Sequence, residues 1–596
     1  MIRTSSTTVP SYERTNSAGT ESRGRQVRDQ LLERFASLRE ILRQKQIKFA
    51  WRICRVGFIL TLCLTGSALA AAQSPADQPS EPDAHRCAAL TEFNLELAPG
   101  GPAVVTSAHI VEVPATGLAR WILTPSGYGS TVSNSSSPIH QYCEVTGYVA
   151  PQSKFELKLP LSADWNQKFF FYACGAFCGT VFGDACNLGL ARRYASATGN
   201  SGHDSAWGFD GVWAANAPEL QEDFGWRSNH VVTLIAKVIT THFYGKPIKY
   251  SYMGGGSKGG QAVLMEAQRF PEDFDGLMPS APVYDYTGRN TIAAAWFAQA
   301  FSDGRGGSVL NAAAAEAMHK SVLEHCGAQA GVEEGLVTDP PSCIWQPEMI
   351  ACPSQSGGPN CLSAGQIAAI KRLMTPATNS KGEVLYAFPY LPGTETMWAG
   401  WNYFGSPRPG ITPRLANLEL PGQYIKYLAD EKIRANADAL TFDFDRVPGT
   451  LARARRIYDA TSLDLRAFKA RGAKLLLWHG WADGAIMATS SIGYYEDVMK
   501  FMGGRKQTED FFRLFLVPGV HHSGGGPGFT EFDSMSILEN WVEKGQAPDR
   551  LIAGKLSNGI VVRTRPVFPY PILARYSGKG DPNSAESFVP FDPSQP

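Results

Sequence analysis

A serine lies inside the glycine-rich pattern Gly255-Gly256-Ser257-Lys258-Gly259. The strand-like run 250–253 precedes the pattern and the helix-like run 261–270 follows it. This order is typical of a nucleophile elbow, a strained turn in which a β-carbon on either side of the serine would collide with backbone. A Gly/Ser-rich loop and a nucleotide-binding turn are the alternatives, but the pattern lacks the Gly-Lys-Ser/Thr order of a phosphate-binding loop. We therefore expect Ser257 to act as a nucleophile.

Such a serine needs a base that takes its proton and an acid that holds the base in one tautomer. Downstream, Asp483 follows the strand-like run 474–478, and two adjacent histidines, His521 and His522, follow the run 511–517. The order serine, acid, histidine, each after a strand, is that of the α/β-hydrolase fold. A loop-capping carboxylate and surface histidines are the alternatives, and the shared order and context favour catalytic roles. The residues by themselves do not choose between the two histidines.

The elements that must position these side chains alternate along the chain. Strand-like runs lie at 168–172, 250–253, 474–478 and 511–517, and helix-like runs lie at 230–243 and 261–270. This alternation predicts a mostly parallel sheet covered by helices. Between 284 and 462 the sequence changes to Ala-rich helices, Gly/Pro-rich loops and clustered aromatic residues. We expect an α/β-hydrolase core formed by residues 73–283 and 463–596, with a large lid domain inserted at 284–462.

Length and charge limit the possible functions. A chain of 596 residues is longer than a single hydrophobic core supports, which agrees with a core plus a large insertion. The 55 basic residues balance 55 acidic ones, and no basic stripe is present along the mature chain after residue 72. Because nucleic-acid binding proteins carry a basic excess or patch, we expect no nucleic-acid partner.

Residues 1–72 have the composition of a leader and signal peptide. Basic residues from Arg43 to Arg55 lead into the apolar run 56–64, and the small residues 68–70 then provide a cleavage site. The apolar run is shorter than the roughly 20 residues that span a membrane. We expect a secreted or periplasmic protein with a signal peptide at about 43–70 and no stable membrane insertion after its cleavage, with an uncleaved anchor as the alternative.

Export permits disulfides, because oxidising compartments preserve them. Removal of Cys54 and Cys63 with the signal peptide leaves nine of the eleven cysteines, an odd number, so at least one thiol stays unpaired or pairs between chains. The spacing Cys174-x3-Cys178-x7-Cys186 could hold zinc, but no histidine lies within this group. A structural disulfide is favoured over a metal there.

Several longer motifs closely resemble the tannase and feruloyl esterase family, which includes the hydrolases of mono(2-hydroxyethyl) terephthalate. Residues 252–261 with 266–276 resemble its nucleophile region, and 479–483 and 518–528 resemble its acid and histidine segments. Further matching motifs are Trp165-Asn166, Gly202-His203, Asp223-Phe224-Gly225 and Tyr244-Gly245-Lys246-Pro247. The resemblance extends over about residues 87–570. It implies an α/β-hydrolase fold, an esterase activity, and His522 as the catalytic histidine, because the family pattern places that histidine directly before a Cys-x-Gly-Gly run.

In two places the sequence departs from the family pattern. Family members usually carry a cysteine before the nucleophile and another after the histidine, joined in a disulfide, and here these positions are Gly256 and Ser523. The family also commonly binds calcium through lid aspartates, which appear here as Gly327, Ala330 and Glu334. Calcium takes 6–8 oxygen ligands, several of them carboxylates, so we expect no metal at this place and no cofactor. The resemblance further implies disulfides that join Cys87 with Cys143, Cys326 with Cys343, and Cys352 with Cys361.

The oxyanion hole of such an enzyme needs two backbone donors. We expect the N–H of Lys258, directly after the nucleophile, to be one donor and that of Gly175, in the loop after run 168–172, to be the other. The side chain of Lys258 is expected to be solvated.

For substrate binding we name the lid aromatics Trp398, Trp401 and Phe404, together with His479. The aromatic residues would pack against a flat acyl group, or alternatively would form the core of the lid. The sequence thus predicts a secreted serine esterase whose partner is a small-molecule ester of an aromatic acid, of the feruloyl, galloyl or terephthaloyl type, cleaved through an acyl-enzyme. Another Ser-His-Asp hydrolase, such as a peptidase or lactonase, and a catalytically silent binding protein are the alternatives.

Overall fold

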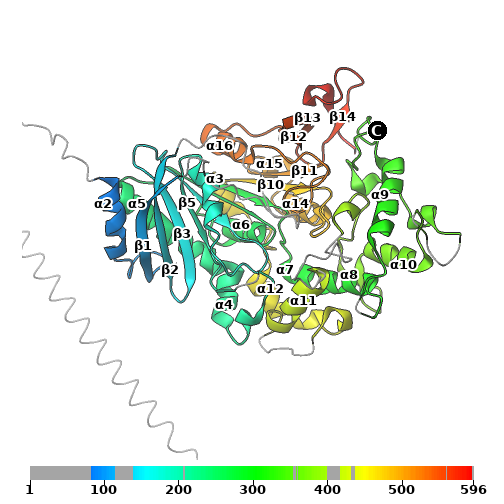
Figure 1. Cartoon of the computed structure of the whole chain (residues 1–596), viewed down its shortest axis with the longest axis horizontal. Coiled ribbons are helices and arrows are strands. Elements are labelled where there is room, and N and C mark those ends of the chain that lie inside the picture. Colours follow the sequence, from blue (N-terminus) through cyan, green and yellow to red (C-terminus); the bar gives the residue numbers. More distant parts are fainter. Residues whose placement is uncertain are drawn as a thin grey trace, which may run out of the picture. The chain divides into compact units, whose positions relative to one another are not determined.

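A computed structural model describes residues 82–593 (Figure 1). Within this span it leaves out 114–117, 119–138, 206–207, 306, 354–357, 359, 399–415, 431–436 and 559. The predicted leader and signal peptide, and the predicted substrate residues Trp401 and Phe404, lie outside the described residues. Among the residues that the structure describes, no helix is long and apolar enough to cross a membrane.

A nine-stranded sheet forms the centre, with the strand order β1-β2-β3-β5-β4-β6-β7-β10-β11. Its strands are β1 (Ala103–Glu112), β2 (Gln141–Val149), β3 (Ser153–Pro160), β4 (Lys168–Ala173), β5 (Ala195–Gly199), β6 (Tyr250–Gly256), β7 (Gly276–Ser280), β10 (Lys474–Gly480) and β11 (Phe512–Val517). Neighbouring strands are antiparallel from β1 to β5 and parallel from β5 to β11. The predicted α/β class with a mostly parallel sheet is confirmed, and the four strand-like runs became β4, β6, β10 and β11.

Both faces of the parallel part are buried, as a parallel sheet requires. Successive strand residues alternate between two hydrophobic clusters, so that Phe169 and Phe171 lie in one and Phe170 lies in the other. On the first face pack α5 (Ser228–Tyr244), α6 (Lys258–Arg269) and α14 (Ala488–Phe501), and on the second packs α16 (Ser534–Lys544). The predicted helices at 230–243 and 261–270 correspond to α5 and α6.

The segment predicted as a lid domain, 284–462, is mostly helical. Its helices are α7 (Tyr286–Gly288), α8 (Ala294–Phe301), α9 (Ala312–Cys326), α10 (Ala364–Leu373), α11 (Ala416–Tyr427) and α12 (Ala452–Tyr458), and Figure 1 shows α8, α9 and α10 away from β1, β2 and β3. They surround a further hydrophobic cluster, which also takes in Phe224 and residues 485–487 of the core. The segment therefore has a core of its own that continues into the sheet-bearing part.

Shorter elements complete the described chain. These are α2 (Asp83–Ala89), α3 (Asn187–Leu190), α4 (Pro218–Glu222), α13 (Arg466–Ala470), α15 (Arg505–Glu509), and the hairpins β8 (Ala377–Thr378) with β9 (Val384–Tyr386), β12 (Leu551–Ser557) with β13 (Ile560–Val567), and β14 (Leu573–Tyr576) with β15 (Phe588–Phe591).

Four disulfides connect the described cysteines. Three of them join Cys87 with Cys143, Cys326 with Cys343, and Cys352 with Cys361, the pairs that the family resemblance implies. The fourth joins Cys174 with Cys178, which the sequence left open, and Cys186 is a buried free thiol. The odd cysteine count is thus explained within the described chain by Cys186, and the 174–186 group contains a disulfide.

Candidate active site

Ser257 lies in a sharp turn between β6 and α6. Its backbone has φ 60° and ψ −119°. Residues other than glycine rarely adopt this conformation, and the surrounding structure must hold it in place. Its N–H donates to the carbonyl of Ser280, at the end of the neighbouring β7, over 3.0 Å. A β-carbon at position 255 would lie 2.7 Å from the backbone of Gly259. The turn can therefore close this tightly only with glycine at position 255. The turn has the geometry predicted for a nucleophile elbow.

Asp483 lies directly after β10 and is fully buried. Its Oδ1 accepts hydrogen bonds from the N–H groups of Ala485 and Ile486, at 2.7 and 2.8 Å. Its Oδ2 lies 2.7 Å from Nδ1 of His522 and 3.1 Å from Nε2 of His479. Burial by itself would raise the pKa of Asp483, but the charge of His522 and the hydrogen bonds from both histidines hold the pKa well below its usual range. The carboxylate is therefore ionised and fixed in direction by four donors.

The structure distinguishes between the two adjacent histidines after β11. His522 is buried and its Nδ1 contacts Asp483, whereas Nε2 of His521 lies 2.9 Å from the hydroxyl of Thr396. The contact of His521 is therefore with the predicted lid segment. Of the two residues, His522 has the geometry of a base that an acid orients, which agrees with the choice made from the family pattern.

His479 occupies a different place from the one expected of a substrate-binding residue. It is fully buried, its Nε2 is within 3.0 Å of the carbonyl of Ile486 and 3.1 Å of Asp483, and its Nδ1 is 2.8 Å from the hydroxyl of Ser491. These contacts place the proton on Nε2, so that His479 donates toward Asp483. Its position is behind the acid, where it supports the carboxylate. Ser491 belongs to α14 and carries no sequence signal that would have linked it to the site.

The two expected oxyanion donors lie at the start of α6 and in the loop after β4. Lys258 is the first residue of α6, where backbone N–H groups have no partner within the helix. The loop after β4 touches the same turn, because a β-carbon at Gly259 would collide with the carbonyl of Ala173. The disulfide between Cys174 and Cys178 encloses Gly175 in that loop. The chain segments of both donors are therefore side by side at the end of the sheet.

The side chain of Lys258 is not solvated, and this expectation from the sequence was wrong. It is 1% exposed, and its ammonium lies 4.5 Å from the ring centroid of Phe224. Within the described chain this ammonium has no hydrogen-bond partner, and burial lowers the pKa of Lys258 to about 7. The aliphatic stem fits the apolar surroundings, and the ring face offers the ammonium partial compensation.

Of the predicted aromatic substrate residues, only Trp398 is described. It is 1% exposed, packs against Tyr390 with 5.4 Å between ring centroids, and donates its indole N–H to the hydroxyl of Thr394. This corresponds to the alternative that the aromatic residue belongs to the core of the segment 284–462. Its buried position leaves no face open to a substrate in this conformation.

The segment that corresponds to the calcium site of the family contains an ion pair and no cluster of carboxylates among its expected ligand positions. Glu334 is buried and pairs with Arg565 of β13, while Gly327 and Ala330 bring no side-chain oxygen. A guanidinium beside the single carboxylate repels a cation, so the donor set present does not fit calcium.

A different group, His230, Glu266 and Asp273, has ligand atoms within 4.8 Å of one another. There Nδ1 of His230 already contacts Asp273 over 2.6 Å, and Lys237 also contacts Asp273. Burial and the nearby charge of Asp273 raise the pKa of Glu266 well above its usual range. The contacts of His230 and Lys237 with Asp273, beside Glu266 of α6, make this group a hydrogen-bonded network.

The sequence is similar to those of known esterases over most of its length. The family model for tannase and feruloyl esterase matches residues 137–590. The mono(2-hydroxyethyl) terephthalate hydrolase of Piscinibacter sakaiensis is 30% identical over 529 residues, covering 76% of this chain and 85% of that protein. Feruloyl esterase B of Aspergillus niger is 25% identical over 555 residues, covering 89% of this chain and 99% of that protein.

Solved structures are similar over most of the chain. The crystal structure of an esterase from Aspergillus oryzae has a TM-score of 0.72 at 25% identity and covers 85% of this chain and all of that one. The tannin acyl hydrolase from Aspergillus niger shares the fold, with a TM-score of 0.65 at 20% identity over 85% of this chain and 94% of that one. The chain therefore belongs to the tannase and feruloyl esterase family and is a carboxylic ester hydrolase with an α/β-hydrolase fold.

Proposed function

We propose that this esterase is a serine hydrolase that uses Ser257 as nucleophile, His522 as general base and Asp483 as the acid that orients the base. The observation that carries the proposal is the 2.7 Å contact between Nδ1 of the buried His522 and the ionised, four-fold hydrogen-bonded Asp483. The strained turn at Ser257 adds support, because strain of this kind persists mainly at functional sites.

In the proposed reaction the hydroxyl oxygen of Ser257 attacks the ester carbonyl carbon while Nε2 of His522 takes its proton. The backbone N–H groups of Lys258 and Gly175 stabilise the negative charge on the carbonyl oxygen. The C–O bond to the alcohol breaks, and His522 returns the proton to the leaving alcohol oxygen. Water then attacks the acyl-enzyme by the same steps, which releases the acid and restores Ser257.

For the substrate we propose esters of aromatic acids of the feruloyl, galloyl or terephthaloyl type. The support comes from two relatives, a mono(2-hydroxyethyl) terephthalate hydrolase and a feruloyl esterase. We further propose that the protein is exported. The basic and apolar pattern before residue 72 supports this, and so do the four disulfides, which persist in oxidising compartments.

A panel of p-nitrophenyl acetate, methyl ferulate, methyl gallate and mono(2-hydroxyethyl) terephthalate tests the reaction and the substrate class together. We expect turnover of at least one aromatic ester that exceeds turnover of the acetate in kcat/KM. Rapid acid quenching should also leave an acyl group on the peptide that contains Ser257, which mass spectrometry detects. Turnover without acylation of that peptide would disprove the serine mechanism, and turnover of the acetate alone would disprove the substrate class.

A further inference from the structure

The disulfide between Cys174 and Cys178 lies in the loop after β4 and is not among the pairs that the family resemblance implies. It closes the ring 174–178, which contains Gly175, the proposed second oxyanion donor. The cysteines of the other three disulfides are 9, 17 and 56 positions apart, against 4 here. Because a cross-link restricts the unfolded chain less when its loop is short, this bond adds less to overall stability than the others do. A local role is therefore the better explanation for it.

The ring leaves the sheet directly beside the nucleophile turn. Ala173, the last residue of β4, pairs with Gly255 of β6. A β-carbon at Gly259 would lie 2.3 Å from the carbonyl oxygen of Ala173 and 3.1 Å from that of Cys174, so the loop backbone lies against the first turn of α6. Movement of the ring would therefore change the separation between its backbone and the other proposed donor, the N–H of Lys258.

The backbone inside the ring is strained. Ala176 and Cys178 have φ of 52° and 60°, in the left-handed region that residues other than glycine seldom adopt. The N–H of Cys178 donates to the carbonyl of Gly175 over 3.0 Å, which closes a tight turn. Strained backbone persists only where the surrounding structure enforces it, and the disulfide joins the two ends of this segment. The bond therefore restricts the backbone at Gly175.

The far end of the ring is anchored in the protein. The N–H of Phe177 donates to the carbonyl of Gly208 over 2.7 Å, and the buried ring of Phe177 packs edge-to-face against Phe224. Directly after the ring, the N–H of Gly179 donates to the carbonyl of Asn200 over 3.2 Å. The disulfide thus ties the end of the ring beside α6 to an end that does not move freely.

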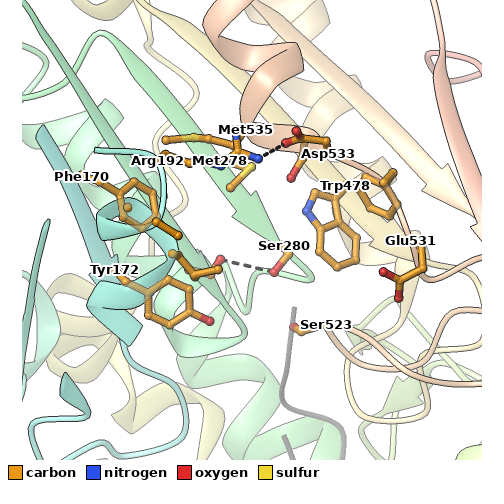
Figure 2. Close-up of a pocket in the computed structure, with 16 residues that line it drawn as sticks. Phe170, Tyr172, Arg192, Met278, Ser280, Trp478, Ser523, Glu531, Asp533 and Met535 are labelled. Carbon is orange, nitrogen blue, oxygen red and sulfur yellow. Dashed lines mark hydrogen bonds and ion pairs between the residues drawn. The ribbon is translucent and has the colours of Figure 1, made fainter. Parts of the chain in front are cut away.

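Packing supports the origin of the loop less on the α16 side of the sheet. A cavity of about 560 Å³ borders the end of β4 there, and Tyr172, Ser280 and Ser523 are among the residues that line it (Figure 2). Space without protein atoms provides no contacts that resist movement of the neighbouring chain. The covalent bond is therefore the stronger restraint on the loop.

We propose that the disulfide between Cys174 and Cys178 positions the oxyanion hole, because it holds the N–H of Gly175 where the carbonyl oxygen of the substrate becomes negatively charged. The inference rests on the proposed serine mechanism and adds to it what makes the second donor rigid. A donor held in advance stabilises the transition state more than the bound substrate. Opening the ring should therefore lower kcat and leave KM nearly unchanged.

The variant Cys174→Ser with Cys178→Ser opens the ring. The matched control is Cys352→Ser with Cys361→Ser, which removes a disulfide of the segment 284–462. Steady-state kinetics on p-nitrophenyl acetate should give a kcat at least tenfold lower in the ring variant, with KM within twofold of the wild type. The control should keep the wild-type kcat. A thermal melt should show that the ring variant is folded at the assay temperature.

A second ester separates positioning from a general loss of structure. In p-nitrophenyl thionoacetate a sulfur replaces the carbonyl oxygen, and sulfur is a weak hydrogen-bond acceptor, so the oxyanion hole contributes less to its hydrolysis. The ratio of kcat/KM between the oxygen ester and the thiono ester should fall at least threefold in the ring variant and stay unchanged in the control. A smaller fraction of folded enzyme would lower both rates by the same factor.

Unchanged kcat in the folded ring variant, or an unchanged ratio of the two esters, would overturn the proposal. Cys174→Ala with Cys178→Ala is measured in the same way if serine prevents folding. Failure of both variants to fold would show that the bond acts on overall stability, which also overturns the proposal. An inactive Ser257→Ala beside a fully active ring variant rejects only the role of the disulfide, whereas an active Ser257→Ala rejects the serine mechanism itself.

Discussion

The nucleophile turn and the histidine loop meet at the same edge of the sheet but are held in different ways. The turn at Ser257 is fixed by backbone: it lies between a central strand and the first residue of α6, and its N–H bonds to β7. The loop 518–528 contains the glycine run 524–526, each residue with a positive φ. It accepts a hydrogen bond at the carbonyl of Val520 from the N–H of Ala482, and its two histidines make side-chain contacts. His522 contacts Asp483, and His521 contacts Thr396.

The comparison shows which part of the site depends on the fold and which part depends on individual contacts. A strand, a helix and the glycines around the turn place Ser257 through backbone contacts. In contrast, His522 lies in a glycine-rich loop that backbone hydrogen bonds close on itself, and its side-chain contact with Asp483 sets the direction of its ring. The family resemblance implies a disulfide between the two parts, and here Gly256 and Ser523 occupy the positions of its cysteines. We expect substitutions in the turn to affect chemistry and substitutions around the loop to affect both geometry and stability.

The largest effect is expected at the turn. Ser257→Ala should lower kcat by a factor on the order of 10⁴–10⁶ and leave the melting temperature close to that of the wild type, because the nucleophile acts on the barrier. Steady-state kinetics on methyl ferulate and a thermal melt measure the two quantities. Ser280→Ala, at the end of the neighbouring strand, is the matched control and should retain most of the activity. Wild-type turnover in Ser257→Ala would end the serine mechanism.

The second effect distinguishes the two histidines of the loop. His522→Ala should lower kcat by about 10⁴ or more, because it removes the base that Asp483 orients. His521→Ala removes only the contact with Thr396 and should lower kcat by about tenfold or less, through a looser loop. Parallel kinetics on the two variants measure the difference. A larger loss in His521→Ala would exchange the roles of the two residues.

The sequence predicted the parts of the site that local pattern encodes. Alternating strands and helices fixed the order of Ser257, Asp483 and His522, and the glycine-flanked turn predicted the backbone at Ser257. The supporting contacts were not predictable, because they join residues distant in the chain: Ser491 behind His479, and Phe224 beneath Lys258. The prediction of a solvated Lys258 was wrong because lysines are rarely buried without a partner, and the sequence therefore favours exposure. Only the packing of Phe224 against the start of α6 reveals that the Lys258 side chain is buried.

A third prediction concerns Lys258, whose burial makes the rigid turn less stable. The pKa of Lys258 in the folded protein is about 7, below its ordinary value of 10.5, so between these pH values the unfolded chain binds more protons. The free energy of unfolding of the wild type should therefore rise as the pH increases from 7 toward 10. Lys258→Met should raise this free energy by about 3 kcal/mol at pH 6, and the gain should shrink as the pH rises.

Urea titrations at pH 6, 8 and 9.5 measure this dependence. Lys381→Met, at an exposed lysine, is the control and should give no gain that depends on pH. A gain for Lys258→Met that is the same at all three pH values would show that the ammonium is solvated in solution.

The fourth prediction restores the tie between turn and loop. A β-carbon at Gly256 would lie 3.0 Å from Cβ of Ser523, slightly closer than the roughly 3.5–4.5 Å of a disulfide, so a small outward movement of the loop permits the bond. Gly256 lies outside the positive-φ region, so a cysteine is tolerated there. We expect Gly256→Cys with Ser523→Cys to form the bond and to stabilise the folded protein by about 2 kcal/mol.

Peptide mapping and a thermal melt, each with and without reductant, test the double variant. The native thiol of Cys186 is buried, and burial raises its pKa, so mispairing with it is disfavoured. The single variant Ser523→Cys is the control and should melt like the wild type. Two free thiols that alkylate readily in the folded double variant would mean that turn and loop are farther apart than the structure shows.

The last prediction is that calcium has no effect on stability. It concerns the segment 327–336, which supports the histidine loop. A β-carbon at Gly519 would lie 2.7 Å from the side chain of Leu336, so this segment packs directly against the loop. At the positions where the family pattern places calcium ligands, the segment has the buried ion pair between Glu334 and Arg565. Arg565 also lies over the ring of Phe588 at 3.7 Å. Because a ligand stabilises a protein only by binding its folded state, neither calcium nor a chelator should change the melting temperature.

Arg565→Met is the positive control: it leaves Glu334 buried without its partner, and it should destabilise the protein by about 3 kcal/mol and loosen the histidine loop. A rise of several degrees with calcium in the wild type would show that other oxygens complete a metal site. The histidine loop would then be supported by a bound metal as well as by the pair of Glu334 with Arg565.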